Sequence, residues 1–252
     1  MSLRQQIIFD LDDTLIHCNK YFEEILSRFA SQLLEWLDTE RLTTEAILAK
    51  QTEIDIAGVK KVGFVSSHFV ESLIDTYRYF CSVIGRDTNL AEEECLAQLG
   101  MSVYDQEVEP YPDMEETLNV LSEQGHELNL YTGGDDLIQQ RKIDRMKLSA
   151  YFEDRIYIRT HKNAEALEEI LQSRPFDRNN TWMIGNSLRT DIAPALTAGI
   201  NTIYIKHPKE WSYNLIDLKK DTNTSMYTIS SLEQVPGIIA ESLAMIVQKN
   251  IQ

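Results

Sequence analysis

Three aspartates lie close together near the start of the chain, at Asp10, Asp12 and Asp13, and Thr14 follows them directly. Three carboxylates at this spacing repel one another unless a cation or a proton offsets their charge. A hard divalent cation is the natural partner, and Mg²⁺ suits a site that combines few carboxylates with a phosphate group. The segment therefore indicates metal-assisted chemistry on a phosphate compound, although a short solvated acidic turn has the same sequence.

The residues before these aspartates indicate how they are positioned. Ile7, Ile8 and Phe9 form a short apolar run of β-forming residues, which is the pattern of a buried parallel strand. In open α/β sheets, ligands bind beyond the C-terminal ends of the strands. We therefore expect the carboxylates of Asp10 and Asp12 at such a strand end.

Polar residues also follow three later strands, which we predict at 127–131, 155–158 and 181–184. These residues are Thr132 and Gly133 after the first strand, Lys162 after the second, and Gly185, Asn186 and Asp191 after the third. Because parallel strands end at the same edge of a sheet, we expect all of them near the aspartates. Lys142 is a rival basic residue, but it lies within a predicted helix rather than after a strand.

The alternation of strands and helices predicts an α/β fold, with a parallel sheet covered by helices on both faces. Two more strands are expected at 202–205 and 226–229, followed by a C-terminal helix. Between the first and second strands, apolar residues recur at three- and four-residue spacing, which predicts a block of helices. We therefore expect a core domain of residues 1–16 and 108–252, and a smaller, all-helical cap domain of residues 17–107 over the strand ends.

Local signals predict where several helices begin and end. Thr43-Thr44-Glu45 is expected to open one helix of the helical block and Asn89 to cap another, and Gly85 is expected to end the helix between them. Asp113 is expected to cap the first helix after this block, with Glu116 as its partner in a capping box.

Composition limits the kinds of partner. The chain has 252 residues and a formal net charge of −16 without any run of basic residues, so we expect no nucleic-acid or membrane partner. Its three cysteines are odd in number and lack metal-ligand spacing, which favours a reducing, cytoplasmic location. The first apolar run is too short for a signal peptide, and no stretch approaches the length of a membrane span. The expected partner is therefore a small molecule.

The four polar segments, in this order, resemble the four motifs of the haloacid dehalogenase superfamily of phosphotransferases. The matching residues are Asp10-Leu11-Asp12-Asp13-Thr14, Thr132, Lys162, and Gly185-Asn186 together with Asp191. Each later motif is weak alone, but the ordered set is specific and fits over essentially the whole chain. The resemblance implies a Rossmann-like core with a helical cap inserted between the first and second motifs.

The resemblance also implies catalytic roles for three residues. Asp10 would be the nucleophile that forms an aspartyl-phosphate intermediate. Asp12 would donate a proton to the leaving oxygen and then, as a base, activate the attacking water. Lys162 would neutralise negative charge on Asp10 and on the phosphate.

A phosphate site and a magnesium site follow from the same resemblance. Thr132, the amide of Gly133 and Lys162 would hold the phosphoryl oxygens. Mg²⁺ would be bound by Asp10, Asp12, Asn186 and Asp191, with the backbone carbonyl as the ligand from Asp12. Asn186 departs from the common pattern, because many members of the superfamily have an aspartate there. An amide oxygen can bind the metal directly or through water, but it brings one negative charge less, so we expect weaker affinity.

These roles predict a Mg²⁺-dependent phosphatase that hydrolyses a small phosphomonoester of a soluble metabolite. A phosphomutase is an alternative, in which the phosphoryl group returns to the substrate. A dehalogenase of the same superfamily is less favoured, since members of that subgroup lack the acid at the position of Asp12. A non-catalytic, phosphate-binding regulatory protein is an alternative of a different class, which Asn186 keeps open.

Overall fold

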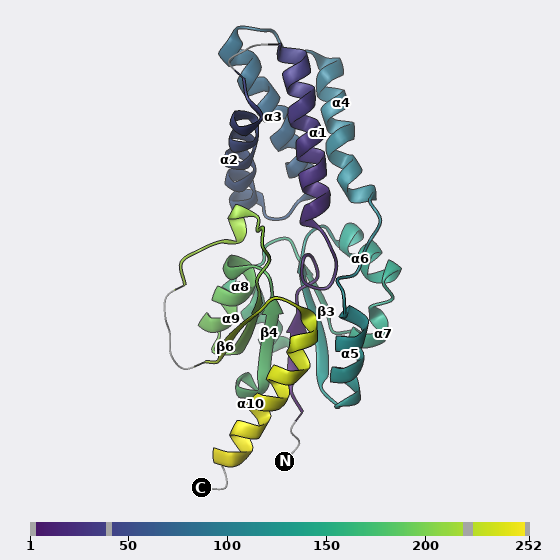
Figure 1. Cartoon of the computed structure of the whole chain (residues 1–252), viewed down its shortest axis with the longest axis vertical. Coiled ribbons are helices and arrows are strands. Elements are labelled where there is room, and N and C mark those ends of the chain that lie inside the picture. Colours follow the sequence, from purple (N-terminus) through teal and green to yellow (C-terminus); the bar gives the residue numbers. More distant parts are fainter. Residues whose placement is uncertain (1–3, 39–41, 219–223, 250–252) are drawn as a thin grey trace.

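The computed structural model describes residues 4–38, 42–218 and 224–249 of the chain. Among these residues, six parallel strands form one sheet in the order β3-β2-β1-β4-β5-β6 (Figure 1). The strands are β1 (Gln6–Phe9), β2 (Glu127–Gly133), β3 (Ile156–Arg159), β4 (Thr181–Gly185), β5 (Asn201–Ile205) and β6 (Met226–Ile229). The α/β fold predicted from the sequence is thus confirmed, and β1, which precedes the aspartates, lies inside the sheet.

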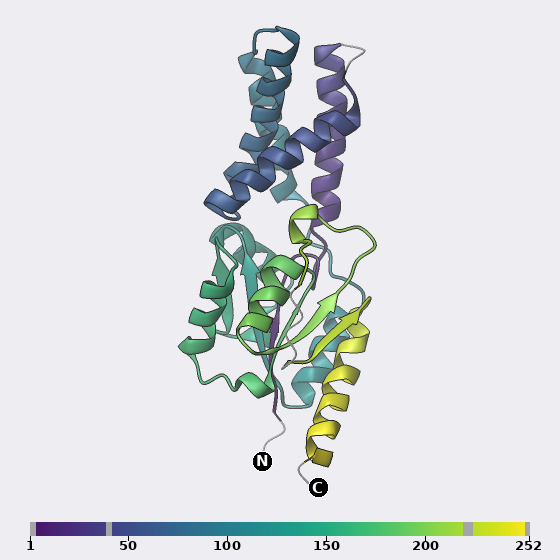
Figure 2. The ribbon, with the colours of Figure 1, turned by 90° about the vertical axis from the view of Figure 1, so that its left-hand side faces the viewer.

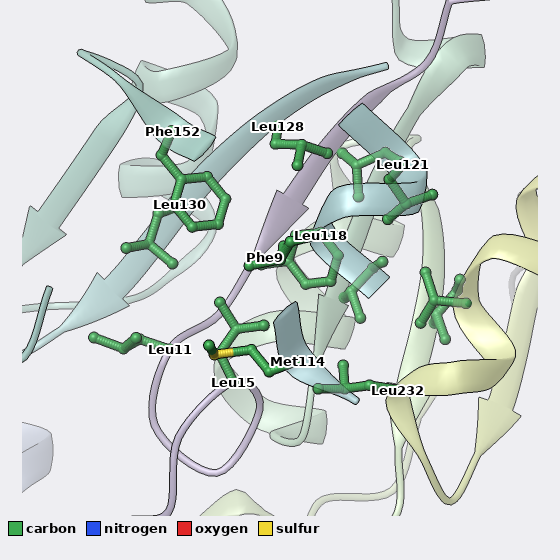
Figure 3. Packing of buried hydrophobic residues seen from close by; sticks show 14 of the residues in the cluster. Phe9, Leu11, Leu15, Met114, Leu118, Leu121, Leu128, Leu130, Phe152 and Leu232 are labelled. Atoms are coloured by element: carbon green, nitrogen blue, oxygen red, sulfur yellow. The ribbon is translucent and has the colours of Figure 1, made fainter. Parts of the chain in front are cut away.

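Strand β1 is buried on both faces because its side chains alternate between two apolar layers. Ile7 and Phe9 belong to a cluster on one face of the sheet, and Ile8 belongs to a cluster on the other. The first cluster (Figure 3) includes side chains of α5 (Met114–Glu123), α6 (Asp136–Arg145), α7 (Ser149–Phe152) and α10 (Val235–Lys249). The second includes side chains of α8 (Ala164–Ser173) and α9 (Ala193–Thr197). This double burial holds the end of β1, and with it Asp10, in a fixed position.

The helical block lies beyond the C-terminal ends of the strands (Figures 1 and 2). Its helices, which we call the cap, are α1 (Asn19–Leu37), α2 (Thr44–Val62), α3 (Ser66–Ile84) and α4 (Leu90–Met101). They bury a hydrophobic cluster of their own, which includes Leu73 and Tyr77. The hydroxyl of Tyr77 donates a hydrogen bond of 2.5 Å to Glu92, so its polar end is also satisfied. None of the described helices combines the length and apolar character needed to cross a membrane.

Three of the predicted helix ends in the cap are confirmed. The side chain of Thr43 accepts a hydrogen bond from the amide of Ala46 at 3.2 Å, and that of Asn89 accepts one from Ala91 at 2.9 Å. Gly85 ends α3 with a φ of 74°, the left-handed conformation that glycine adopts at little cost.

One other prediction of a helix end is wrong. Asp113 has a φ of 64° and its side chain makes no capping hydrogen bond, so the capping box with Glu116 does not form. An N-cap carboxylate reaches the first-turn amides from an extended backbone, and the left-handed backbone of Asp113 turns it away. Helix α6 ends at Arg145, and Lys147 shortly after it adopts a left-handed φ of 53°.

Leu73→Ala tests whether the cap is stabilised by its own core. Leu73 is fully buried in the cap cluster, so truncation leaves a cavity and should lower the free energy of unfolding by about 2–5 kcal/mol. Leu90→Ala is the matched control, because Leu90 is 78% exposed at the start of α4. Leu90→Ala should change the free energy of unfolding by less than about 0.5 kcal/mol. Urea unfolding followed by circular dichroism compares the two variants, and equal losses would contradict this account of the cap.

Candidate active site

The ammonium group of Lys162 contacts two carboxylates at the C-terminal edge of the sheet. It forms ion pairs with Asp10, which follows β1, and with Asp191, whose Oδ1 lies 2.5 Å from Nζ. Asp10, Lys162 and Asp191 are 5%, 6% and 1% exposed. The structure thus brings together three predicted site residues that come from three separate segments of the chain.

Burial sets the charge balance of this cluster. Burial raises the pKa of Asp10 to about 7, while Lys162 acts to lower it and Asp191 to raise it. Burial also acts to lower the pKa of Lys162, but attraction to Asp10 and Asp191 outweighs this effect and raises that pKa above its usual value. One ammonium therefore faces two carboxylates, and the excess negative charge favours a further cation or a proton.

The carboxylate of Asp10 is held in one orientation. Thr14 donates a hydrogen bond of 3.0 Å to its Oδ2, while Lys162 contacts its Oδ1. The amide of Asp10 donates to the carbonyl of Ile184 at 2.9 Å, which extends the pairing of β1 with β4 by one residue. Backbone and side-chain contacts together fix this carboxylate at the strand end.

The carboxylate of Asp12 is bound by two side chains of α6. The ammonium of Lys142 lies 2.7 and 2.8 Å from its two oxygens, and Gln139 donates to it at 2.9 Å. Lys142 thus belongs to the site although it lies in a helix rather than after a strand, and no sequence signal points to Gln139. Their three-residue spacing places both on one face of α6, but only the docking of α6 beside β1 shows which face points at the site.

Thr132 and Gly133 form the end of β2, the neighbour of β1. Thr132 is fully buried, and its hydroxyl accepts a hydrogen bond of 2.6 Å from Gln139. A Cβ atom at position 133 would lie 2.7 Å from the ring of Phe64, which belongs to the loop between α2 and α3. Glycine is therefore needed here for the cap to approach so closely. No sequence pattern points to Phe64, since this contact depends on how the cap folds over the core.

The loop between α2 and α3 is also attached to the core by hydrogen bonds. The amide of Phe64 donates to the carbonyl of Thr160 at 2.8 Å. The amide of Ser66, in the first turn of α3, donates to the carboxylate of Asp135 at 2.8 Å. A core residue thus caps a cap helix, which stabilises the closed arrangement of the two parts.

Asp191 is held against the backbone at the end of β4. It lies in a helical turn, Leu188–Ile192, and its Oδ2 accepts a hydrogen bond of 2.9 Å from the amide of Ser187. A Cβ atom at position 185 would lie 2.2 Å from the same oxygen, so Gly185 permits this close approach. Steric contact with Asp191 therefore explains why the fourth motif has a glycine at position 185.

Asp13 has a structural place beside the site. Its carboxylate accepts hydrogen bonds from the amides of Cys18 at 3.0 Å and Asn19 at 2.9 Å, where α1 begins. Burial raises the pKa of Asp13 to about 6, although these backbone hydrogen bonds act to lower it. Its position ties the first motif to the entrance of the cap.

The residues predicted to bind Mg²⁺ offer oxygen ligands of the kind that this cation prefers. Oδ1 of Asp191 is buried and, among the described residues, has no hydrogen-bond donor in good geometry, although Lys162 lies beside it. Asn186 donates from Nδ2 to Glu210 at 3.4 Å, so its Oδ1 is the atom that remains for a cation. No three His, Cys, Asp or Glu side chains of the described chain form a metal-binding group. A cation would therefore rely on two carboxylates, those of Asp10 and Asp191, with neutral oxygens and water, which suits Mg²⁺.

A cavity of about 870 Å³ lies between the strand ends and the cap. Asp10, Thr132 and Lys162 line its core side, while residues of α1, α2 and α3 line its cap side. The volume is within the range of small-molecule sites.

The comparison with protein families agrees with the motifs. The model of the haloacid dehalogenase-like hydrolase family matches residues 7–205, a segment that includes all four motifs. The chain therefore belongs to the family of haloacid dehalogenase-like hydrolases, and the resemblance inferred from the sequence is confirmed.

Individual relatives are more distant. A ribulose-1,5-bisphosphate 5-phosphatase from Halopiger xanaduensis is 26% identical over 220 residues, covering 81% of this chain and 85% of the relative. A glyceraldehyde 3-phosphate phosphatase from Methanopyrus kandleri is 25% identical over 243 residues, covering 93% and 97%. A haloacid dehalogenase-like hydrolase from Xanthomonas campestris has a similar solved structure, with a TM-score of 0.78, 21% identity and 98% and 95% coverage. At this identity the structural likeness shows a common fold.

Asp10→Asn is expected to stabilise the metal-free protein at alkaline pH. The pKa of Asp10 is about 7 in the folded protein against 3.8 as its usual value. The contribution of Asp10 to the free energy of unfolding therefore falls as the pH rises from 3.8 to about 7, and it stays low at higher pH. The variant removes this penalty and leaves Lys162 paired with Asp191. Its Tm should exceed that of the wild type by roughly a few degrees at pH 8, and by less at pH 5.

Thermal unfolding in a chelator at both pH values provides the measurement. Asp87→Asn is the control, because Asp87 is exposed in the loop between α3 and α4 and should leave Tm unchanged. A Tm of Asp10→Asn below that of the wild type at pH 8 would contradict an excess of negative charge in the cluster.

Proposed function

We propose that the protein is a Mg²⁺-dependent phosphatase that hydrolyses a small phosphomonoester through an aspartyl-phosphate on Asp10. The observation that carries this proposal is the contact of Lys162 with both Asp10 and Asp191 at one end of the cavity. The phosphatase names of two relatives in the same family support it.

In the first half of the reaction, an oxygen of Asp10 attacks the phosphorus atom and the bond to the leaving oxygen breaks. Thr14 and Lys162 orient this carboxylate, so little reorganisation is needed. Lys162, together with the hydroxyl of Thr132 and the amide of Gly133, offsets the charge spread over the phosphoryl oxygens. The product of this half is a phosphorylated Asp10 and a free alcohol.

Asp12 transfers the protons in both halves. It gives a proton to the leaving alcohol, and as a carboxylate it then takes one from the water that attacks the aspartyl-phosphate. Lys142 pairs with both carboxylate oxygens of Asp12 and holds this side chain in place at the site. Gln139 bridges Asp12 and Thr132, and so links the proton-transfer group to the phosphate site.

Mg²⁺ would be held by the carboxylates of Asp10 and Asp191, the amide oxygen of Asn186 and the backbone carbonyl of Asp12. When bound, it supplies the positive charge that lets an anionic carboxylate approach an anionic phosphate. Two observations support this assignment. Oδ1 of Asp191 is buried without a hydrogen-bond donor in good geometry among the described residues, and Asn186 donates from Nδ2 to Glu210, which leaves its Oδ1 for the cation.

Residues 17–107 form the cap domain in this proposal, and residues 1–16 and 108–252 form the catalytic core. The contacts of Phe64 with Gly133 and of Ser66 with Asp135 support closure of the cap over the phosphate site. Closure excludes bulk water and strengthens the electrostatic contacts inside the cavity.

Hydrolysis of p-nitrophenyl phosphate with and without Mg²⁺ tests the proposed function. The wild type should turn over only with Mg²⁺, and Asp10→Asn should abolish turnover while the protein stays folded. Asp191→Asn should require roughly tenfold more Mg²⁺ for half-maximal activity, because one of two carboxylate ligands loses its charge. Asp87→Asn, far from the site, is the control for both variants.

Two outcomes would contradict the proposal. Full activity of the wild type in a chelator would show that the reaction does not require a metal. Absence of turnover in either condition, for protein with a normal Tm, would favour a phosphate-binding regulatory protein over an enzyme.

A further inference from the structure

The cap side of the cavity contains three buried polar side chains next to apolar ones. Gln51 and Asp55 of α2 and His68 of α3 line the cavity and are 2%, 8% and 8% exposed. The surrounding apolar lining residues are Phe22, Leu26, Leu48, Val59 and Phe69. Polar groups of this kind in an apolar site usually fix the orientation of a ligand.

The carboxylate of Asp55 has little compensation for its burial. The ring of His68 lies beside it, with Nε2 at 3.7 Å from Oδ1 of Asp55 and 2.9 Å from the backbone oxygen of Asp55. That ring is immobilised against Gly58, where a Cβ atom would lie only 1.8 Å away. Burial raises the pKa of Asp55 to about 6, although His68 and a hydrogen bond with Ser72 act to lower it. A ligand group that donates a hydrogen bond would therefore stabilise this buried carboxylate.

Within the described part of the chain, every lysine that lines the cavity already has a carboxylate partner, and no arginine lines it. The pairs are Lys20 with Glu109, Lys142 with Asp12, Lys162 with Asp10 and Asp191, and Lys209 with Glu23. The cap instead contributes the additional carboxylates of Glu24 and Asp55 to the lining. A second anionic group of the substrate would therefore compete with a carboxylate for any of these ammonium groups.

We infer that the substrate is a phosphate monoester whose leaving group donates a hydroxyl hydrogen bond to Asp55 and carries no second phosphate or carboxylate. The inference rests on the proposed phosphatase function and specifies the substrate class of that site. Sugar and polyol monophosphates have this chemistry.

Charge explains why bisphosphates should be poor substrates. A second phosphate would enter a low-dielectric cavity whose cap wall contains a buried carboxylate, and the like charges would repel one another. The names of the two phosphatase relatives cover both kinds of substrate, a bisphosphate and a monophosphate. The charges around Asp55 place this chain with the monophosphate kind.

Two substrate sets test the inference on the wild-type enzyme with Mg²⁺. The first contains glycerol 3-phosphate, glyceraldehyde 3-phosphate, ribulose 5-phosphate and fructose 6-phosphate. The second contains ribulose 1,5-bisphosphate, fructose 1,6-bisphosphate and phosphoglycolate. The best substrate should come from the first set, with kcat/KM at least about tenfold above the best of the second.

Other results overturn the inference. A best substrate from the second set would do so, and so would turnover of p-nitrophenyl phosphate with none of the first set hydrolysed. In both cases the phosphatase proposal stands. Absence of turnover with every ester, p-nitrophenyl phosphate included, removes the phosphatase proposal itself and the inference with it.

Asp55→Asn tests the role of Asp55 in substrate recognition. The variant keeps the shape and loses the charge, so KM for the best hydroxylated substrate should rise about tenfold, and more than KM for p-nitrophenyl phosphate. Glu53→Gln is the matched control, because Glu53 lies on the same helix with its side chain 69% exposed. An equal effect of Asp55→Asn on both substrates would remove Asp55 from substrate recognition. If the variant does not fold, the comparison of the two substrate sets decides alone.

Discussion

The ammonium of Lys162 lies between the carboxylates of Asp10 and Asp191, and all three groups are almost completely buried. Charges buried this deeply are tolerated only when their partners are held in good geometry. Here the partners come from the ends of different strands, so the sheet order that places β1 between β2 and β4 is a condition for the cluster. The apolar layers on both faces of β1 supply the rigidity that this arrangement needs.

The cluster is also incompletely neutralised, and this imbalance connects stability with function. Two carboxylates share one ammonium, so burial leaves the pKa of Asp10 near neutrality instead of near 4. A protein selected for stability alone would have an uncharged residue at this position. In our account, the excess negative charge is retained because it attracts the cation that phosphoryl transfer requires. Phe64 and Ser66 hold the cap against the core beside this cluster, and in the proposed mechanism this keeps water from weakening these interactions.

Much of the fold could be predicted from local sequence, because the information lies in short segments. Apolar runs such as the one at 7–9 predict buried strands, and Thr43 and Asn89 predict helix starts through a single side chain. Asp113 shows the limit of such reasoning, since a good capping residue cannot act from a left-handed backbone. That backbone conformation is set by the path of the chain back to the core, which no local pattern contains.

Some residues of the candidate site can likewise be predicted from the sequence, and others cannot. Residues at strand ends could be found from the sequence, because strand direction alone places them at one edge of the sheet. The side chains of Gln139 and Lys142 could not be assigned to Asp12, because their position depends on how α6 packs against the sheet. Contacts between cap and core, such as that of Phe64 with Gly133, depend on the arrangement of two separately packed parts.

In the proposed mechanism, Asp10 itself receives the phosphoryl group. Mass spectrometry of the enzyme, quenched in acid during steady-state turnover and then digested, tests this most directly. The account predicts that the peptide containing Asp10 gains the mass of one phosphoryl group and that this species disappears once the substrate is exhausted. An unmodified Asp10 peptide in an enzyme quenched during rapid turnover, with a phosphoryl group on another residue, would contradict it.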